Sequence, residues 1–296
     1  MLKAKKRFGQ NFLKDTSVLH KIIQSMPVNS NKLIEIGPGL GDLTQRLLEV
    51  KPVLAYEVDK NLITFLKDKF SKEINEERFS IVEGDVLEKF QNGSLSDELY
   101  DLVANLPYYI ATTIILEALK DPLCKSLIVM IQKEVAIKFA ASCKTKEFTS
   151  LAVLAQTIGK VSILFDVKPE SFEPQPKVTS SVLMIKKEKE FIKGKFSGVF
   201  ETNKELDMFE KYLRNSFKAP RKTWLKNISQ WVDKEYIHQL LDKYNLPLTI
   251  RPHELSVDSH HLLFNKLRIK ETWKRRKRGK CLKTTKDKKI TMEIKK

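Results

Sequence analysis

The chain of 296 residues has few cysteines, and their placement suggests neither a disulfide framework nor a metal site. Cys124, Cys143 and Cys281 are an odd number and lie far apart, with no CxxC pair and no histidine at metal-ligand spacing. We therefore expect idle or buried thiols in a reducing compartment, and no bound metal.

Long apolar runs are also missing. No stretch of about 18 uncharged apolar residues is present to span a bilayer. The start of the chain, MLKAKKRFGQNFL, is basic but lacks the apolar segment of a signal peptide. The sequence therefore predicts a soluble protein that works in the cytoplasm without a membrane.

Positive charge is abundant, and most of the excess lies near the C-terminus. Residues 266–296 hold 15 Lys or Arg against three acids, so +12 of the net charge of +17 lies there and +5 remains for residues 1–265. This segment has few apolar residues with which to fold. We predict that residues 272–296 form a disordered tail that binds a polyanion, with nucleic acid favoured over a merely solubilising role.

Short apolar runs alternate with amphipathic segments in the first part of the chain. This pattern is typical of parallel strands joined by right-handed helical crossovers, so the predicted fold is α/β with a doubly wound, mostly parallel sheet. Two later runs, 161–167 and 180–187, are predicted to be neighbouring antiparallel strands that close it. The other predicted strands are 32–36, 52–58, 78–84, 100–106 and 126–131, and the helices are 42–50, 59–70, 111–121 and 132–141.

The strand pattern disappears after about residue 190. Four amphipathic segments follow, interrupted by Ala219-Pro220, Asp233 and Leu246-Pro247. The sequence thus predicts an α/β domain over residues 1–188 and a small all-α domain over 189–271, before the tail. The four predicted helices are 203–218, 221–232, 234–244 and 256–269.

Three successive predicted strands end in residues suited to a nucleoside ligand. EIGPGLGDLT has Gly37, Gly39 and Gly41 at alternate positions, which allow a tight turn and close backbone approach to a ligand. The next strand ends in Glu57, where an acid can accept hydrogen bonds from a ribose diol, and the third is followed by Asp85, suited to an adenine amino group. Taken singly, each of these acids can also be a solvent-exposed residue at the end of a strand that binds no ligand.

The fourth predicted strand ends in Asn105-Leu106-Pro107-Tyr108. The Asn105 amide oxygen and the Leu106 carbonyl can accept both hydrogens of an exocyclic amine, and Tyr108 can stack on the base that bears it. Such acceptors orient the weakly nucleophilic adenine N6 toward an electrophilic methyl group. The alternative is a Pro-Tyr turn that only packs on the sheet. A nicotinamide oxidoreductase is disfavoured, because the spacing is GxGxG rather than GxGxxG.

Several motifs together resemble the ribosomal RNA adenine dimethyltransferases, most closely the bacterial small-subunit (KsgA) family. The resemblance implies a Rossmann-like class I methyltransferase fold, S-adenosylmethionine as donor, and dimethylation of two adjacent adenines near the 3′ end of 16S rRNA. It extends over about residues 3–270. The motifs are RFGQNFL (7–13), EIGPGLGDLT (35–44), YEVD (56–59), EGDVL (83–87), NLPYYIAT (105–112), MIQKEVAIKF (130–139) and SFEPQPKVTSSV (171–182).

The resemblance also implies roles for individual residues. Asn105 is expected between the cofactor and the target, and Leu106 and Tyr108 beside the target adenine. Phe172 is expected to close on that base from the other side, and the alternative is a core side chain that supports the Pro-rich turn. The implied cofactor contacts are Asn11, Leu13, Gly37, Gly39, Glu57, Asp85, Val86 and Asn105.

For RNA, the resemblance implies contacts by a basic N-terminal cluster and by the turn before a helix of the second domain. In APRKTWLKNI, Ala219 and Pro220 depart from the basic start typical of the family. The expected partner is the small ribosomal subunit, bound by a monomer. The implied RNA-binding residues are Lys5, Lys6, Arg7, Arg221 and Lys222.

Two other functions stay open at this point. One is the related large-subunit methyltransferase of macrolide resistance, and the other is a non-catalytic RNA-binding assembly factor with the same fold. Within NLPYYIAT, Tyr108 is expected to stack on the target, whereas Tyr109 is expected to pack under the following helix.

Overall fold

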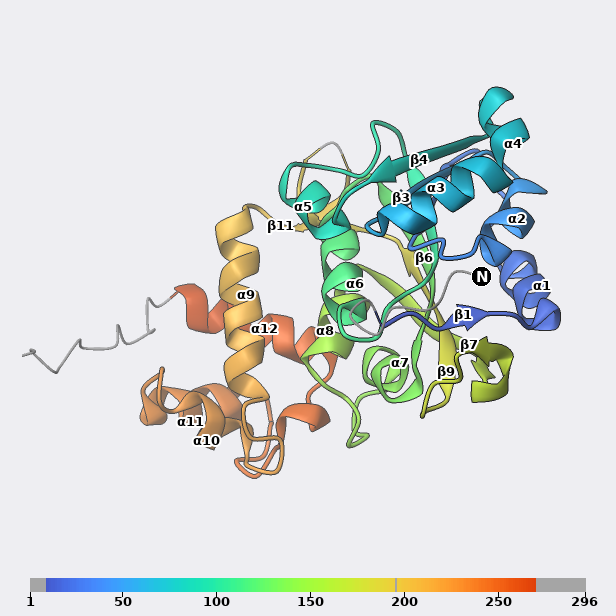
Figure 1. Ribbon diagram of the computed structural model, residues 1–296. Helices are drawn as coiled ribbons and strands as arrows, with labels where there is room; N and C mark the ends of the chain where they lie inside the picture. The colour runs from blue at the N-terminus through green and yellow to red at the C-terminus, as the bar shows by residue number, and fades with distance from the viewer. Residues whose placement is uncertain (1–8, 195, 270–296) are drawn as a thin grey trace, which may run out of the picture.

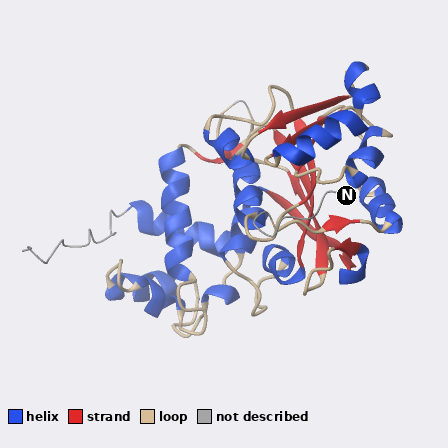
Figure 2. Cartoon of the chain, viewed as in Figure 1, coloured by secondary structure: helices blue, strands red, loops and turns tan. Residues whose placement is uncertain are grey.

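The computed structural model describes residues 9–194 and 196–269. A seven-stranded sheet with helices on both sides is followed by a cluster of helices at the C-terminal end (Figure 1). Figure 2 separates these parts by colour: the strands gather in one half and the other half is almost entirely helical. The predicted α/β class with a helical C-terminal part is confirmed.

The large sheet has the strand order β4-β3-β2-β5-β6-β9-β7. Strands β2 to β6 run parallel, and β9 runs antiparallel to both β6 and β7, as predicted. The chain moves outward from β2 in one direction and returns to β5 on its other side, so the order reverses between them. The strands are β2 (Lys32–Ile36), β3 (Val53–Glu57), β4 (Phe79–Glu83), β5 (Tyr100–Asn105), β6 (Cys124–Gln132), β7 (Gly159–Val167) and β9 (Ser180–Lys187).

Alternate residues of the central strands enter two hydrophobic clusters, one on each face of the sheet. Ile34 and Leu102 belong to one cluster, and Leu33 and Val103 to the other. Helices α1 (Thr16–Gln24), α2 (Asp42–Leu48) and α3 (Lys60–Lys69) cover one face, and α4 (Ser71–Asn75) leads into β4. The other face is covered by α5 (Val86–Gln91), α6 (Ala111–Lys120), α7 (Lys133–Ala140) and α8 (Ser150–Ile158).

Aspartates cap two of the helices that follow strands, α3 and α5. The Asp59 side chain accepts the backbone N–H of Asn61 at the start of α3, and Asp85 accepts that of Leu87 at the start of α5. Both helices begin just beyond the carboxyl end of a strand. The need to cap these helices therefore holds acidic side chains at that edge of the sheet.

Short strand pairs lie outside the large sheet. β1 (Phe12–Leu13) pairs with β8 (Phe172–Glu173), next to a 3₁₀ turn at Pro169–Ser171. β10 (Glu190–Ile192) pairs with β11 (Gly198–Phe200), so the expectation of no strand after about residue 190 is wrong here. Strands of three residues are too short to give a recognisable period in the sequence.

The four predicted C-terminal helices are confirmed, although one is shorter than expected. They are α9 (Asn203–Ser216), α10 (Trp224–Ile228), α11 (Lys234–Lys243) and α12 (Val257–Ile269), with a 3₁₀ turn at Pro252–Glu254. The shortened helix, α10, starts only after Thr223, whose hydroxyl accepts the backbone N–H of Lys226. Arg221 and Lys222 therefore lie in a turn.

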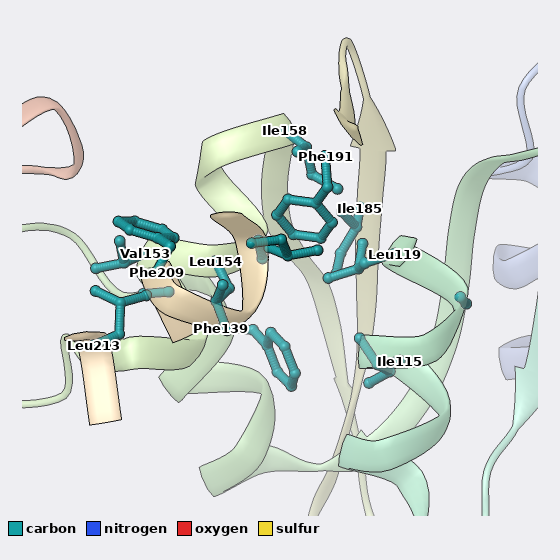
Figure 3. Packing of buried hydrophobic residues seen from close by; sticks show 14 of the residues in the cluster. Ile115, Leu119, Phe139, Val153, Leu154, Ile158, Ile185, Phe191, Phe209 and Leu213 are labelled. Atoms are coloured by element: carbon teal, nitrogen blue, oxygen red, sulfur yellow. The ribbon is translucent and has the colours of Figure 1, made fainter. Parts of the chain in front are cut away.

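The hydrophobic core continues from the sheet into the C-terminal helices. Figure 3 shows Leu119 of α6, Ile158 of α8 and Phe209 of α9 in the same cluster of buried side chains. The division into residues 1–188 and 189–271 stays a prediction. In the part of the chain that the structure describes, no helix is both long and apolar enough to cross a membrane.

Candidate active site

A cavity of about 250 Å³ opens at the carboxyl ends of β2, β3, β4 and β5. Ligands of doubly wound sheets bind at this edge, where the strand order reverses. Residues 9–13, which we call the N-terminal strap, form part of its wall. Ten predicted site residues line the cavity: Asn11, Leu13, Gly37, Gly39, Glu57, Asp85, Val86, Asn105, Leu106 and Tyr108.

The glycine loop after β2 needs glycine for two different reasons. Gly37 and Gly39 have left-handed φ angles of 68° and 61°. A Cβ atom at Gly39 would lie 2.9 Å from Cδ1 of Phe12, so a side chain there would displace the Phe12 ring. A Cβ at Gly37 would meet no atom within 4 Å. The backbone at Gly37 is thus open to close approach by a ligand.

Glu57 is a buried acid at the end of β3, with 5% of its surface exposed. Its Oε1 accepts the backbone N–H groups of Val58 and Asp59, each at 2.9 Å, and Oε2 lies 3.4 Å from the Gly39 nitrogen. Burial raises the pKa of Glu57, and these N–H donors lower it. The carboxyl group is therefore held in one orientation between the strand end and the glycine loop.

A second buried acid, Glu35 of β2, also lines the cavity. Burial, with a smaller contribution from the nearby charge of Glu57, raises its pKa to about 8, and the hydrogen bond from Thr44 opposes this rise. Thr44 Oγ1 donates to Glu35 Oε2 at 2.7 Å. Sequence reasoning missed Glu35, although a single charged residue inside the apolar run KLIEI was an available signal. Near neutral pH the protonated form of Glu35 is therefore favoured.

Asp85 lies on the same edge, beyond β4. Its Oδ1 accepts the Leu87 N–H at 2.9 Å, and the side chain is otherwise exposed. The next residue, Val86, is buried. Gly84 donates its N–H to the Glu57 carbonyl at 3.0 Å, which joins the two strand ends. An exposed acceptor and an apolar side chain therefore adjoin each other, as a purine ring with an amino group requires.

Asn105 ends β5 and connects the sheet to the strap. Its Nδ2 donates to the backbone carbonyl of Asn11 at 2.9 Å. Because the amide nitrogen is used in this way, Oδ1 is the atom with which Asn105 can accept a hydrogen bond from a ligand. Leu106 donates its N–H to Met130 at 3.1 Å and its side chain is buried, so only its backbone is available to a ligand.

The two adjacent tyrosines differ in their surroundings. Tyr108 Oη lies 2.6 Å from Ser180 Oγ, and burial raises the pKa of Tyr108. Tyr109 is 63% exposed and lines the cavity, so the expectation that it packs under the following helix is wrong. The physical reason is that α6 begins only at Ala111, which leaves Tyr109 in the turn before it.

Phe172 does not line the cavity. It is buried, with 3% of its surface exposed, and it pairs with Leu13 of the strap through β8 and β1. The neighbouring Ser171 accepts the N–H of Lys14 at 2.8 Å. The segment 171–173 therefore anchors the strap, and a direct role of Phe172 on the target base stays a prediction.

The strap supplies further residues that sequence reasoning missed: Gly9, Gln10 and Phe12 line the cavity beside Asn11 and Leu13. Their placement depends on the pairing of β1 with β8, about 160 residues away, and on the Asn105 bond. No local pattern in the sequence indicates these contacts. Only the resemblance of the QNFL motif pointed to this segment.

The predicted RNA-binding residues lie apart from the cavity or outside the described residues. Arg221 and Lys222 are exposed in the turn between α9 and α10, on the helical side of the molecule (Figure 1). Lys5, Lys6, Arg7 and the tail 272–296 fall outside the described residues. Within residues 9–194 and 196–269, no group of three or more His, Cys, Asp or Glu side chains is arranged to hold a metal ion.

Comparison with known proteins identifies the family. A sequence profile described as ribosomal RNA adenine dimethylase matches residues 1–267. The chain belongs to the ribosomal RNA adenine dimethylase family. Membership in this family makes it an S-adenosylmethionine-dependent rRNA adenine dimethyltransferase.

Family members from several bacteria are similar over most of their length. A relative in Campylobacter concisus, named Ribosomal RNA small subunit methyltransferase A, is 49% identical over 265 residues, which cover 89% of this chain and 94% of the relative. The protein of the same name in Campylobacter jejuni strain RM1221 is 47% identical over 280 residues, with 95% and 100% covered.

Solved structures support the same dimethylase fold. A dimethyladenosine transferase from Plasmodium falciparum is 25% identical, with a TM-score of 0.73, and the match covers 88% of this chain and 99% of that structure. The 23S rRNA methyltransferase ErmE has a TM-score of 0.65 at 21% identity, with 87% and 100% covered. The second likeness shows the fold alone.

Proposed function

We propose that this dimethylase transfers methyl groups from S-adenosylmethionine to N6 of two adjacent adenines near the 3′ end of 16S rRNA, which gives N6,N6-dimethyladenosine. The observation that carries the proposal is the meeting of Glu57, Asp85 and Asn105 in one cavity. The small subunit is favoured because relatives 45–49% identical are named Ribosomal RNA small subunit methyltransferase A.

The two alternatives have less support. A large-subunit target rests only on the likeness to ErmE, which at 21% identity concerns the fold. A non-catalytic assembly factor does not require a cavity in which the nucleoside-binding and amine-binding residues converge. Ten such residues meet in this cavity, which favours an enzyme.

The cavity residues fit S-adenosylmethionine, which supplies a methyl group on a positively charged sulfur. The fixed carboxyl group of Glu57 is suited to the ribose hydroxyls. Asp85 and Val86 are suited to the adenine amino group and ring face, and the open backbone at Gly37 to the methionine portion. Asn11 and Leu13 of the strap close the same space.

Asn105 and Leu106 are the groups that we assign to the target amine. The Oδ1 atom of Asn105 and the carbonyl of Leu106 accept the two N6 hydrogens and hold the nitrogen lone pair toward the methyl carbon. As the new N–C bond forms, the carbon–sulfur bond breaks, and the nitrogen then loses a proton to water. No strongly basic side chain is needed, because the alkylated nitrogen is acidic.

Tyr108 is the residue that we assign to stacking on the target base. Its ring lines the cavity directly after Pro107, and the hydrogen bond to Ser180 limits its rotation. A preset ring loses little conformational freedom when a base stacks on it. The adenine must leave its own stack, or be unpaired already, to reach this ring.

Recognition of the RNA is assigned to phosphate contacts outside the cavity. Arg221 and Lys222 are exposed on the helical side. Lys5, Lys6, Arg7 and the basic tail stay predictions from the sequence. Shape and backbone charge dominate the binding of folded RNA, so these cations are expected to set affinity rather than the choice of base.

The site of action follows from the substrate. Because the small ribosomal subunit is made in the bacterial cytoplasm, we infer that the dimethylase acts there and contributes to subunit biogenesis. We also expect a monomer, since one chain contains both the cavity and the exposed cations.

The proposal is tested by incubating the purified protein with radiolabelled S-adenosylmethionine and with separate small and large subunits from a strain that lacks the gene. We expect label in dimethyladenosine at two adjacent positions of 16S rRNA and none above background in the large subunit. Label in large-subunit RNA, or in neither, would overturn the proposal.

A further inference from the structure

Tyr109 has an environment that the proposed chemistry does not use. It is one of few large apolar side chains that are mostly exposed among the described residues, and it also lines the cavity. An aromatic side chain that is 63% exposed loses the stabilisation that burial would give it. A ring at the mouth of a substrate cavity is in a position to regain this stabilisation from the substrate.

One part of the Tyr109 ring rests on the strap. A Cβ atom added to Gly9 would lie 3.3 Å from Cδ1 and 3.6 Å from Cε1 of Tyr109, so the ring packs against the backbone of this glycine. Gly9 itself has a left-handed φ of 58°. Contact with the strap limits the freedom of the ring while the rest of it stays exposed, which lowers the entropic cost of stacking a ligand on it.

The proposed substrate supplies a second base at a short distance. When one of two adjacent adenines is in the cavity, the other is only one nucleotide away and no longer has its stacking partner. Exposed aromatic rings bind unstacked bases without regard to their hydrogen-bonding edges. Tyr108 is bonded to Ser180 and assigned to the adenine in the cavity, which we call the inner base. Stacking of the adjacent base, the outer base, therefore requires another ring.

We propose that Tyr109 stacks on the nucleobase adjacent to the adenine in the cavity and so positions the pair for successive methylation. This inference rests on the proposed function. It gives the two tyrosines separate ligands, an inner base for Tyr108 and an outer base for Tyr109.

The test uses small subunits in which one of the two target adenines is replaced by 2-aminopurine, a fluorescent base that lacks the N6 amine. The other adenine is then the only substrate, and stacking quenches the reporter. The variants are Tyr109→Ala, Tyr109→Leu, which keeps an apolar contact with Gly9, and Tyr109→Phe, which keeps the ring.

We expect quenching with the wild type and Tyr109→Phe, and its loss with Tyr109→Ala and Tyr109→Leu. With subunits that contain both target adenines, Tyr109→Ala and Tyr109→Leu should show a KM for the subunit about tenfold higher, with kcat changed less than about twofold. Calorimetry with S-adenosylhomocysteine should give the same affinity for all four proteins.

Two results would overturn the inference. One is quenching and KM that are unchanged in both Tyr109→Ala and Tyr109→Leu. The other is a loss of S-adenosylhomocysteine affinity with an unchanged RNA KM, because Tyr109 would then only hold the strap. A wild-type protein that methylates no small-subunit adenine would instead refute the proposed function, which keeps the two failures distinguishable.

Discussion

The carboxyl edge of the sheet and the C-terminal helices differ in where they place polar and apolar side chains. At the sheet edge, polar side chains are buried or half-buried and bonded to backbone groups, as Glu57 and Asn105 are. In the helical region, residues 203–269, aromatic rings fill much of the interior and most charged side chains are exposed, whereas buried Glu205 pairs with Arg268 at 2.7 Å. Phe209, for example, stacks on His261 with ring centres 4.4 Å apart.

The sheet edge carries the groups that we assign to catalysis, whereas the helical region provides stability and RNA contacts. Strand ends fix functional groups to within the tolerance that methyl transfer requires, and each group is held by a named hydrogen bond. The helices need only a stable core and exposed cations, for which exact side-chain positions matter less. Substitutions at the edge should therefore change rate or cofactor affinity, whereas those in the helices should change stability or salt-dependent RNA affinity.

The largest effect is expected for Asn105→Ala. Removal of the acceptor for the target amine should lower the rate of methyl transfer about 100- to 1,000-fold in single-turnover assays. The loss of the bond to Asn11 should change S-adenosylmethionine affinity far less, which calorimetry can measure. A wild-type rate of methyl transfer in this variant would contradict the assignment of Asn105 to the target amine.

Glu57→Gln is expected to weaken the binding of S-adenosylmethionine about 30-fold, because an amide cannot offer two acceptor oxygens. Isothermal titration calorimetry measures this change. The matched control is Glu83→Gln, at the register partner of Glu57 on the neighbouring strand. Glu83 is exposed and pairs with Lys60 at 3.2 Å, so its substitution should change affinity less than about twofold. Equal effects at both positions would contradict the assignment.

Acid should destabilise the helical region through two histidines, the buried His260 and the half-buried His261. Burial lowers the pKa of His260 to about 3 and that of His261 to about 4. Neutral imidazole is required in the fold, whereas the unfolded chain takes up protons below about pH 6.5, so stability is complete above that pH and falls as the pH is lowered toward 4.

At pH 5 the expected loss is about 2 kcal/mol for each histidine. Urea unfolding followed by tryptophan fluorescence reports on this region, because Trp224 lies in its core. His261→Phe should reduce the pH dependence; the Thr157 hydroxyl, which lies 2.8 Å from His261 Nε2, would keep its hydrogen bond to the Val153 carbonyl at 2.7 Å. Stability that is flat between pH 7 and 5 would exclude this account.

The smallest effect is expected for the double substitution of Arg221 and Lys222 by Gln. RNA affinity should fall by several-fold, and the dependence of log affinity on log salt should become shallower by about 2, one for each cation that no longer neutralises a phosphate. Filter binding at several salt concentrations measures both. Lys204→Gln is the control, since Lys204 is exposed at the opposite end of α9, a helix of 14 residues. Equal slopes of log affinity against log salt in both variants would show that the turn with Arg221 and Lys222 does not contact the RNA.

Much of the fold was predictable because its signals are local. The apolar runs give β2 to β7 and β9 with boundaries within a few residues, and alternation with helices predicts the parallel order. The pairs β1–β8 and β10–β11 were not predictable, since strands of two or three residues have no period. Their stability depends on contacts distant in the sequence.

The candidate site divides in the same way. Glu57, Asp85 and Asn105 could be predicted to converge because each follows a parallel strand. The strap was indicated by the resemblance alone. The exposure of Tyr109 depends on the start of α6 at Ala111, and its N-cap, Ile110, is not a residue type that marks a helix start in the sequence. For Phe172, the motif suggests the target base; the side chain is buried and does not line the cavity, and its role on that base stays a prediction.

We assign to Asn105, held by the strap at the end of β5, the role of presenting the target amine to the methyl donor. Mass spectrometry of nucleosides from the 3′ end of 16S rRNA tests this assignment, in a deletion strain complemented with wild type or with Asn105→Ala at equal expression. We predict two N6,N6-dimethyladenosines with the wild type and unmodified adenines with the variant. Full dimethylation by the variant would contradict the claim.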